Sequence, residues 1–275
     1  MTMLVAQLTD THIKAGGALA YQHVDTAAFL RKAVDHINAF QPTIDAVIVT
    51  GDLVDMGRGE EYATTREIFE RLTMPYYIVP GNHDHHNNLR AAFHTHAHLQ
   101  SDETFIQYAI ENFPIRLVGL DSTVEGQPHG VLSADRLAWL DETLKAEPQK
   151  PTLLFLHHPP FDIGIRHMDA QKLQNANDLF SVLASHTQIR HIACGHAHRP
   201  VETSIQGISI SIGPNAAHSV TLDLDPDGPS TFTMDPPAIR LFQFSDDGKC
   251  ISHLSYVGNF TGPLPFYEEN GALID

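Results

Sequence analysis

The chain has 275 residues, of which 42% are hydrophobic and 18% charged, a composition typical of a globular protein with a sizeable core. Its formal net charge is −16, so its surface repels polyphosphate backbones, and we expect no nucleic-acid polymer as a partner. Its cysteines, Cys194 and Cys250, exclude a disulfide framework; no segment resembles a membrane span or a signal peptide, and we therefore expect a cytoplasmic protein without membrane contact.

Short apolar runs typical of buried strands alternate with amphipathic helices from the N-terminus to about Cys194. This alternation predicts an α/β fold. The expected strands are residues 4–8, 46–50, 76–79, 115–120, 152–156 and 191–194. The expected helices are one from the N-cap Asp25 to Phe40, residues 60–72, residues 88–97, one capped by Ser133, and residues 173–183.

The pattern changes after Cys194, where strands follow one another with little helix. The expected strands are residues 205–212, 219–224, 238–244 and 251–257, and they predict a second, mostly antiparallel sheet. Residues 226–237 are rich in Pro, Gly and Asp and indicate an exposed excursion. We find no repeat and no linker in the sequence, and therefore predict a single domain over residues 1–275.

Five short polar segments each follow an apolar run. In an extended backbone, residues i and i+2 point the same way, so Asp10 and His12 can reach one ion together, as can His196 and His198. Carboxylates and imidazoles together suit Fe, Mn, Zn or Co better than Ca or Cu(I). Asp52 can bridge two ions, Asn82 adds a neutral oxygen, and His157 adds an imidazole. The predicted metal-binding set is Asp10, His12, Asp52, Asn82, His157, His196 and His198.

This set predicts a two-metal hydrolytic site. Two ions about 3.5–4 Å apart would clamp a phosphoryl group and share a hydroxide at neutral pH. His83 follows Asn82, and its side chain diverges toward the substrate, where it stabilises the phosphoryl oxygens or protonates the leaving alkoxide. Either Asp55 or Asp84 orients His83.

Each segment has an ordinary explanation when it is taken alone. Asp-x-His is usually a solvated loop, Gly-Asp after a strand is often a turn, and Gly-His-Ala-His can lie on a surface. Five such coincidences in one chain, each at a strand end, are improbable. We interpret His158, the neighbour of His157, as a packing or supporting residue and not as a ligand.

In chain order these segments read D-x-H, G-D-x-x-D, G-N-H-D, H and G-H-x-H over residues 10–198, and the set resembles the calcineurin-like metallophosphoesterase superfamily. The resemblance implies a four-layer α/β/β/α sandwich of two mixed sheets flanked by helices. It also implies that one ion is held by Asp10, His12, Asp52 and His198, and the other by Asp52, Asn82, His157 and His196. It assigns His83 to the phosphate and favours Asp55 over Asp84 as the partner of His83.

The Asp10-Thr11-His12 start and the runs at residues 80–84 and 157–160 are similar to the compact bacterial branch of the superfamily. That branch contains class III cyclic-nucleotide phosphodiesterases and glycerophosphodiesterases. Its members often dimerise through the C-terminal part, which implies a dimer or higher homo-oligomer with a cap or dimerisation excursion around residues 218–275. In its glycerophosphodiesterases an aromatic residue and a later histidine face the substrate, and Tyr21 and His218 are the candidates here.

The predicted protein is therefore a dinuclear-metal-dependent hydrolase in which metal-bound hydroxide attacks phosphorus. The expected substrates are small phosphodiesters, namely cyclic nucleotides such as cAMP or glycerophosphodiesters. Two alternatives stay open: a phosphomonoesterase, and a non-catalytic metal-binding module with this fold. A degenerate module is expected to have lost ligands, whereas every ligand position and His83 are present.

Overall fold

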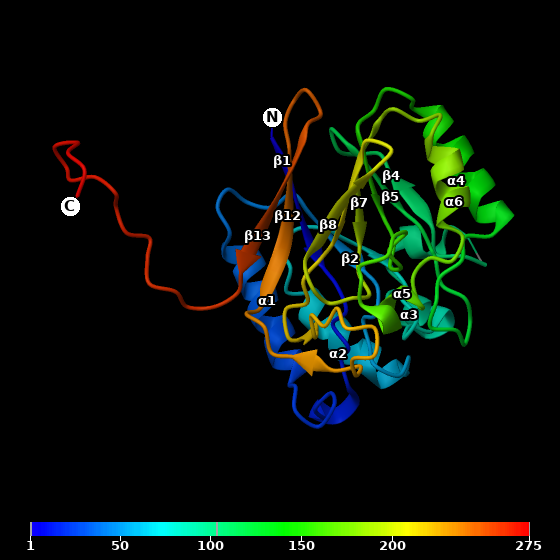
Figure 1. Cartoon of the computed structure of the whole chain (residues 1–275), viewed down its shortest axis with the longest axis horizontal. Helices are drawn as coiled ribbons and strands as arrows, with labels where there is room; N and C mark the ends of the chain where they lie inside the picture. Colours follow the sequence, from blue (N-terminus) through cyan, green and yellow to red (C-terminus); the bar gives the residue numbers. More distant parts are fainter. Residues whose placement is uncertain (1, 103, 275) are drawn as a thin grey trace.

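Two mixed β-sheets lie between layers of helices in the computed structural model, which describes residues 2–102 and 104–274 (Figure 1). The first sheet has the order β13-β12-β1-β2-β3, and the second has the order β4-β5-β6-β7-β9-β8. Helices α1 and α2 lie on the side of the first sheet, and α4 and α6 on the side of the second (Figure 1). The predicted architecture, two mixed sheets flanked by helices, is confirmed.

Parallel strands form the centre of the first sheet. They are β1 (Met3–Leu8), β2 (Ala46–Thr50) and β3 (Tyr76–Val79), with Val5 opposite Ala46 and Val47 opposite Tyr76. All residues of these strands are buried, as their continuous apolar runs predict. The antiparallel strands β12 (Ala238–Phe244) and β13 (Cys250–Tyr256) extend the sheet beside β1.

The second sheet also has a parallel centre, formed by β5, β6, β7 and β9. Antiparallel strands close its two edges, β4 beside β5 and β8 beside β9. The bounds are β4 (Tyr108–Ile110), β5 (Arg116–Gly119), β6 (Thr152–Phe155), β7 (Ile189–Cys194), β8 (Val201–Ile205) and β9 (Ile208–Ile212).

The helices follow from apolar periodicity and from their caps. In α1, Leu30, Val34 and Ile37 are buried, and the Asp25 carboxylate accepts a hydrogen bond from the N–H of Ala28 at 2.9 Å. Ser133 caps α4 in the same way. The helices are α1 (Thr26–Ala39), α2 (Gly59–Phe69), α3 (His86–Ala92), α4 (Ala134–Ala146), α5 (Arg166–Asp169) and α6 (Ala176–Leu183), with 3₁₀ turns at Ala15–Gly17 and Ala97–Gln100.

The expected separate antiparallel sheet after Cys194 is wrong. Strands β8 and β9 join the second sheet, whereas β12 and β13 cross back to the first. The run 205–212 is also two strands and not one, because Gln206 and Gly207 both adopt positive φ (52° and 80°) and reverse the chain in a two-residue hairpin. Only Ser219–Val220 of the expected strand 219–224 is extended, as β10, and it pairs with β11 (Phe232–Thr233).

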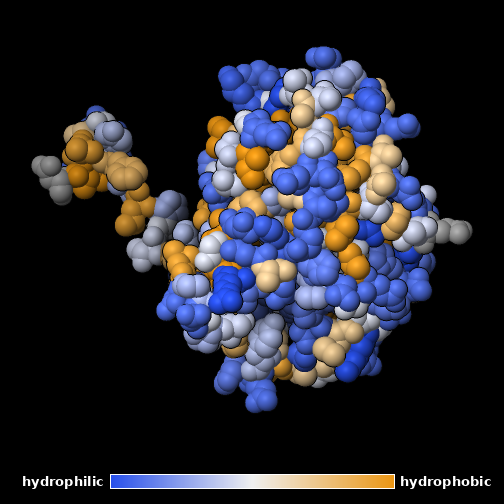
Figure 2. Space-filling view, turned by 45° about the vertical axis from the view of Figure 1, so that its right-hand side comes forward, coloured by the Kyte–Doolittle hydropathy of each residue, from blue (hydrophilic) through white to orange (hydrophobic). Residues whose placement is uncertain are grey.

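The C-terminal segment from Gly258 leaves the body of the protein after β13 (Figure 1). It carries large apolar side chains that are each more than half exposed, and Figure 2 shows the arm at the left of the molecule, with hydrophobic residues among polar ones. They are Phe260, Leu264, Phe266, Tyr267 and Leu273. Among the described residues, no helix combines the length and apolarity that a membrane crossing requires.

Candidate metal centre

The predicted ligands meet because they follow strands that end at one edge of the two sheets. Asp10, Asp52 and Asn82 lie just after the neighbouring parallel strands β1, β2 and β3. His157 follows β6, and His196 follows the adjacent strand β7. The carboxyl ends of parallel strands share an edge, and this edge is where open α/β sheets bind ligands.

Local backbone strain is concentrated at this edge. Asp10, His12, Asp52, His196 and His198 all adopt positive φ, between 41° and 75°, a region that side chains with a Cβ rarely occupy. Such strain costs about 1–3 kcal/mol per residue and persists where the surrounding structure enforces it, most often at functional sites.

Two glycines allow the strand ends to approach closely. A Cβ at Gly81 would collide with the carboxylate and backbone of Asp52, and a Cβ at Gly195 would collide with Thr9 and with the backbone of Thr50. Glycine is therefore required where these motifs begin. Any side chain at Gly195 would force β7 away from the first sheet and separate His196 from Asp10.

The first cluster of donor atoms contains Asp10, His12 and His198. The two Nε2 atoms of His12 and His198 lie 3.1 Å apart, and Asp10 Oδ1 is 3.4 Å from His198 Nε2. Asp52 Oδ2 approaches the same group, at 3.7 Å from His12 Nε2. All four side chains are buried.

The second cluster is centred on His157. Its Nε2 lies 3.1 Å from Asn82 Oδ1, 3.1 Å from His196 Nδ1 and 3.3 Å from Asp52 Oδ2. Its Nδ1 donates to the carbonyl of Thr50 at 2.8 Å, which orients the ring and directs Nε2 into the cluster. The same oxygen of Asp52 therefore lies near one imidazole of each cluster.

The protonation states of these groups suit metal binding. Burial raises the pKa of Asp10, but the charge of His198 outweighs this effect and lowers the pKa to about 2. Burial lowers the pKa of His196 to about 3, so its imidazole is neutral. Burial also disfavours a charged His157, but the Asp52 carboxylate overrides it and raises the pKa to about 9, so an ion there must displace a proton.

The donor set fits metal ions better than it fits a network of hydrogen bonds. The Nε2 atoms of His12 and His198 face each other at 3.1 Å, and between neutral imidazoles only one of them can donate to the other. A cation among these nitrogens and the carboxylates of Asp10 and Asp52 would be bound by all four side chains. The described residues therefore form His/Asp clusters fit to hold metal.

His83 lies beside the clusters and lines the cavity in front of them. Its backbone N–H donates to Asp52 Oδ1 at 2.8 Å, and its Nδ1 donates to the backbone carbonyl of Asp55 at 2.8 Å. Its Nε2 stays available to a bound substrate. Burial lowers the pKa of His83, but the Asp52 carboxylate and the Asp55 carbonyl outweigh burial and raise it, which favours the protonated ring.

The support of His83 differs from the expected one, because Asp55 contacts it through the main chain and not through the carboxylate. The Asp55 carboxylate lies instead against Lys14 Nζ, and its other oxygen is 3.6 Å from His12 Nδ1. The contacts with His12 and Lys14 hold the pKa of Asp55 well below its usual range. Asp55 thus favours the His12 tautomer that leaves Nε2 free for a metal.

Asp84, the other expected support of His83, stabilises the turn before α3. It accepts hydrogen bonds from the N–H groups of Gly81 at 2.9 Å and Leu53 at 3.3 Å and from the Tyr62 hydroxyl at 2.9 Å. Burial and the charge of Asp52 raise its pKa to about 6. Its role is therefore to fix the loop that carries Asn82 and His83.

Lys14 was not predicted from the sequence, and its contact with Asp55 leads to a test. Lys14→Met is expected to weaken Mn²⁺ binding about tenfold, because a less firmly held Asp55 orients His12 less well. The measurement is the Kd for Mn²⁺ by calorimetry on metal-depleted protein. Lys172→Met, which removes an exposed pairing with Asp162, is the control; an unchanged Kd in Lys14→Met would refute this role.

His158 lies within reach of His157 and His196, but its ring nitrogens make other contacts. Its Nδ1 contacts the Ser122 hydroxyl at 2.8 Å, and its Nε2 contacts the carbonyl of Pro128 at 3.2 Å. Both ring nitrogens therefore have partners outside the clusters, and the supporting role of this residue stays a prediction.

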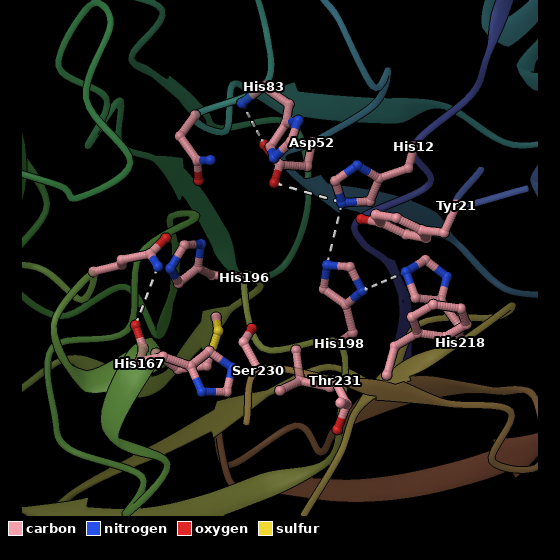
Figure 3. Close-up of a pocket in the computed structure, with 15 residues that line it drawn as sticks. His12, Tyr21, Asp52, His83, His167, His196, His198, His218, Ser230 and Thr231 are labelled. Atoms are coloured by element: carbon pink, nitrogen blue, oxygen red, sulfur yellow. Dashed lines mark hydrogen bonds and ion pairs between the residues drawn. The ribbon is translucent and has the colours of Figure 1, made fainter. Parts of the chain in front are cut away.

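A cavity of about 360 Å³ opens in front of the clusters, and both Tyr21 and His218 line it. His218 Nε2 lies 3.1 Å from His198 Nδ1, so His218 contacts a predicted ligand directly. Figure 3 shows His167, Ser230 and Thr231 across the cavity from His83. Sequence patterns did not indicate these residues, because they lie in loops and in a turn of helix without a motif.

Comparisons with known proteins agree with this geometry. The family model of the calcineurin-like phosphoesterases matches residues 3–200. The chain belongs to this family. A solved dimetal phosphatase from Danio rerio shares the fold of this phosphoesterase, with a TM-score of 0.64 at 16% identity, covering 91% of this chain and 98% of that one.

Two relatives of the phosphoesterase match over most of their length. This chain is 42% identical to a probable glycerophosphodiester phosphodiesterase from Arcobacter nitrofigilis, and the match covers 99% of this chain and 100% of that protein. It is 31% identical to a 3',5'-cyclic adenosine monophosphate phosphodiesterase from Escherichia coli, covering 89% and 86%. The predicted superfamily is therefore confirmed.

Proposed function

We propose that this phosphoesterase hydrolyses small phosphodiesters, glycerophosphodiesters before cyclic nucleotides, with two metal ions. The observation that carries the proposal is the position of Asp52 Oδ2, within 3.3–3.7 Å of an imidazole in each of two donor clusters. A shared carboxylate between two clusters is the arrangement that a two-metal site requires. The names of the two relatives support diester substrates.

The cluster around His12 would hold one ion and the cluster around His157 the other, with Asp52 shared between them. Asp10, His12, Asp52 and His198 would hold the first, and Asp52, Asn82, His157 and His196 would hold the second. When bound, such ions offset the charge of the phosphoryl oxygens and activate water for attack. The ligand set accepts Fe, Mn, Zn or Co.

The chain's own residues supply the remaining chemistry. Asp55 holds His83 Nδ1 by its carbonyl, so Nε2 faces the cavity and is the atom that transfers a proton. The raised pKa of His83 favours its protonated form, which stabilises the phosphoryl oxygens and donates the proton to the leaving alkoxide. Tyr21 and His218 line the same cavity and contact the bound ester.

The charge of the cavity favours diesters over monoesters. Its lining residues among those described include no lysine and no arginine. A phosphomonoester is mostly a dianion at neutral pH, because the second pKa of a phosphate group is about 6, whereas a diester carries one charge. Beyond the ions, only histidines are present to offset that second charge, so the diester is the better match.

The test of this proposal compares bis(p-nitrophenyl) phosphate with p-nitrophenyl phosphate on the Mn²⁺-loaded protein. We expect a higher kcat/KM for the diester. A preference for the monoester would replace the proposal by a phosphomonoesterase. Release from neither substrate, with metal bound, would favour the non-catalytic alternative.

We also propose that the protein is a homo-oligomer joined through the exposed C-terminal arm. Five large apolar side chains of the described arm are each more than half exposed, and burial against a second copy would remove them from water. Such an arm corresponds to part of the cap or dimerisation excursion expected around residues 218–275 within one domain.

Charges on the arm are expected to dissociate the oligomer. In the variant Leu264→Asp with Phe266→Asp, light scattering after size exclusion should give a mass near 30.4 kDa, whereas the unmodified chain should give a multiple of it. Asn270→Asp, also on the arm, is the control for added charge. A monomer in the unmodified chain would rule out this assembly.

A further inference from the structure

The wall of the cavity that faces His83 is formed by residues that have no part in metal binding. It comprises His167, Met168 and Gln171, on and just after α5, with Ser230 and Thr231 before β11 (Figure 3). We propose that His167 and Gln171 form a subsite for the hydroxyl groups of an uncharged polyol arm of the ester. This inference rests on the proposed function and adds which part of the substrate the wall recognises.

His167 and Gln171 are joined to each other and are free toward the cavity. The Gln171 Nε2 donates to the backbone carbonyl of His167 at 3.1 Å, which fixes the amide one helical turn away from the imidazole. The amide oxygen of Gln171 and the imidazole of His167 have no hydrogen-bond partner within residues 2–102 and 104–274. Donors and acceptors that line a cavity without protein partners are suited to a ligand that supplies them.

The wall is polar but carries no carboxylate, lysine or arginine. Imidazole, amide and hydroxyl groups suit a neutral arm that carries hydroxyls. A hydroxyl can donate a hydrogen bond to an acceptor and accept one from a donor, and the wall offers both kinds of group. A second phosphate or an acidic arm would find no counter-charge there. Thr231 donates to the Thr221 hydroxyl at 2.9 Å, so it braces the hairpin and still offers lone pairs to a ligand.

The aromatic residues of the cavity do not form a slot for a nucleobase. Tyr21 and Phe232 lie 5.1 Å apart between ring centroids, and each also packs against His218, at 5.3 and 5.6 Å. A base stacked between two rings would require them to be about 7 Å apart, twice the ~3.5 Å contact distance. The three rings contact one another instead, so the polar wall offers the more specific contacts, and these suit a glycerol-like arm.

The test uses two substrates with one leaving group, glyceryl p-nitrophenyl phosphate and propyl p-nitrophenyl phosphate, on the Mn²⁺-loaded protein. They carry the same charge and differ in two hydroxyls. We expect the unmodified protein to prefer the glyceryl ester in kcat/KM. Gln171→Leu and His167→Phe should each lower kcat/KM for the glyceryl ester about five- to tenfold, the value of one lost hydrogen bond, and leave the propyl ester within about twofold.

Gln174→Leu is the matched control, since Gln174 makes the same contact with the carbonyl four residues before it but does not line the cavity. Inhibition by glycerol 3-phosphate should weaken in the two variants, and inhibition by propyl phosphate should not. Equal losses on both esters, or none, would overturn the subsite while the diesterase activity stands. Failure of the unmodified protein to cleave either ester would instead count against the proposed function.

Discussion

Asp52→Asn is expected to lower kcat/KM for bis(p-nitrophenyl) phosphate by about 10³, equivalent to about 4 kcal/mol of transition-state stabilisation. The change replaces the Oδ2 that lies near His12 and His157 by an amide nitrogen, which cannot coordinate a cation. It keeps Oδ1, which accepts from the His83 N–H. Fewer than two ions per chain should be retained, as measured by elemental analysis of the dialysed protein.

The control for Asp52→Asn is Asp162→Asn, which removes an exposed carboxylate paired with Lys172. It should retain metal and activity, because surface ion pairs contribute little to stability. A thermal unfolding curve for each variant separates metal loss from misfolding. Full metal content together with unchanged activity in Asp52→Asn would remove Asp52 from the site.

His83→Ala is expected to lower kcat by about 10²–10⁴, the usual contribution of a general acid, while metal content stays at the unmodified level. The reason is that His83 contacts Asp52 through its backbone and reaches the cavity through its ring. In the unmodified protein, kcat should fall as the pH rises through the pKa of His83, because the protonated ring is the active form. His83→Ala should lose this alkaline decline.

Asn88→Ala provides a comparison for His83→Ala. Asn88 donates to the carbonyl of Gly57 and does not line the cavity. Its kcat and pH profile should match those of the unmodified protein. If His83→Ala loses metal, His83 is a ligand and its assignment as proton donor is wrong.

The family and the position of the motifs were accessible from the sequence for a physical reason. A buried parallel strand reads as a short apolar run, and the polar residues directly after it must lie at the sheet edge. Asp10, Asp52 and His157 follow such runs, and the structure brings them together. The α1 helix was predictable because Asp25 caps it and its apolar face repeats regularly.

Long-range contacts were not accessible in this way. Local periodicity does not tell which sheet a late strand joins, so β12 and β13 were assigned to the wrong sheet. The contact between Lys14 and Asp55 joins two loops 41 residues apart, and no spacing pattern in the sequence predicts it. His167 and Gln171 face the cavity because of how α5 packs, which depends on the whole fold.

The most direct test of a two-metal phosphodiesterase is a titration of metal-depleted protein with Mn²⁺, with bound metal and hydrolysis of bis(p-nitrophenyl) phosphate measured on the same samples. Two ions per chain should bind, and hydrolysis should appear only when both are bound, since Asp52 is shared between the two positions in the proposed assignment. Full activity at one ion per chain, or activity without added metal, would contradict the two-metal account.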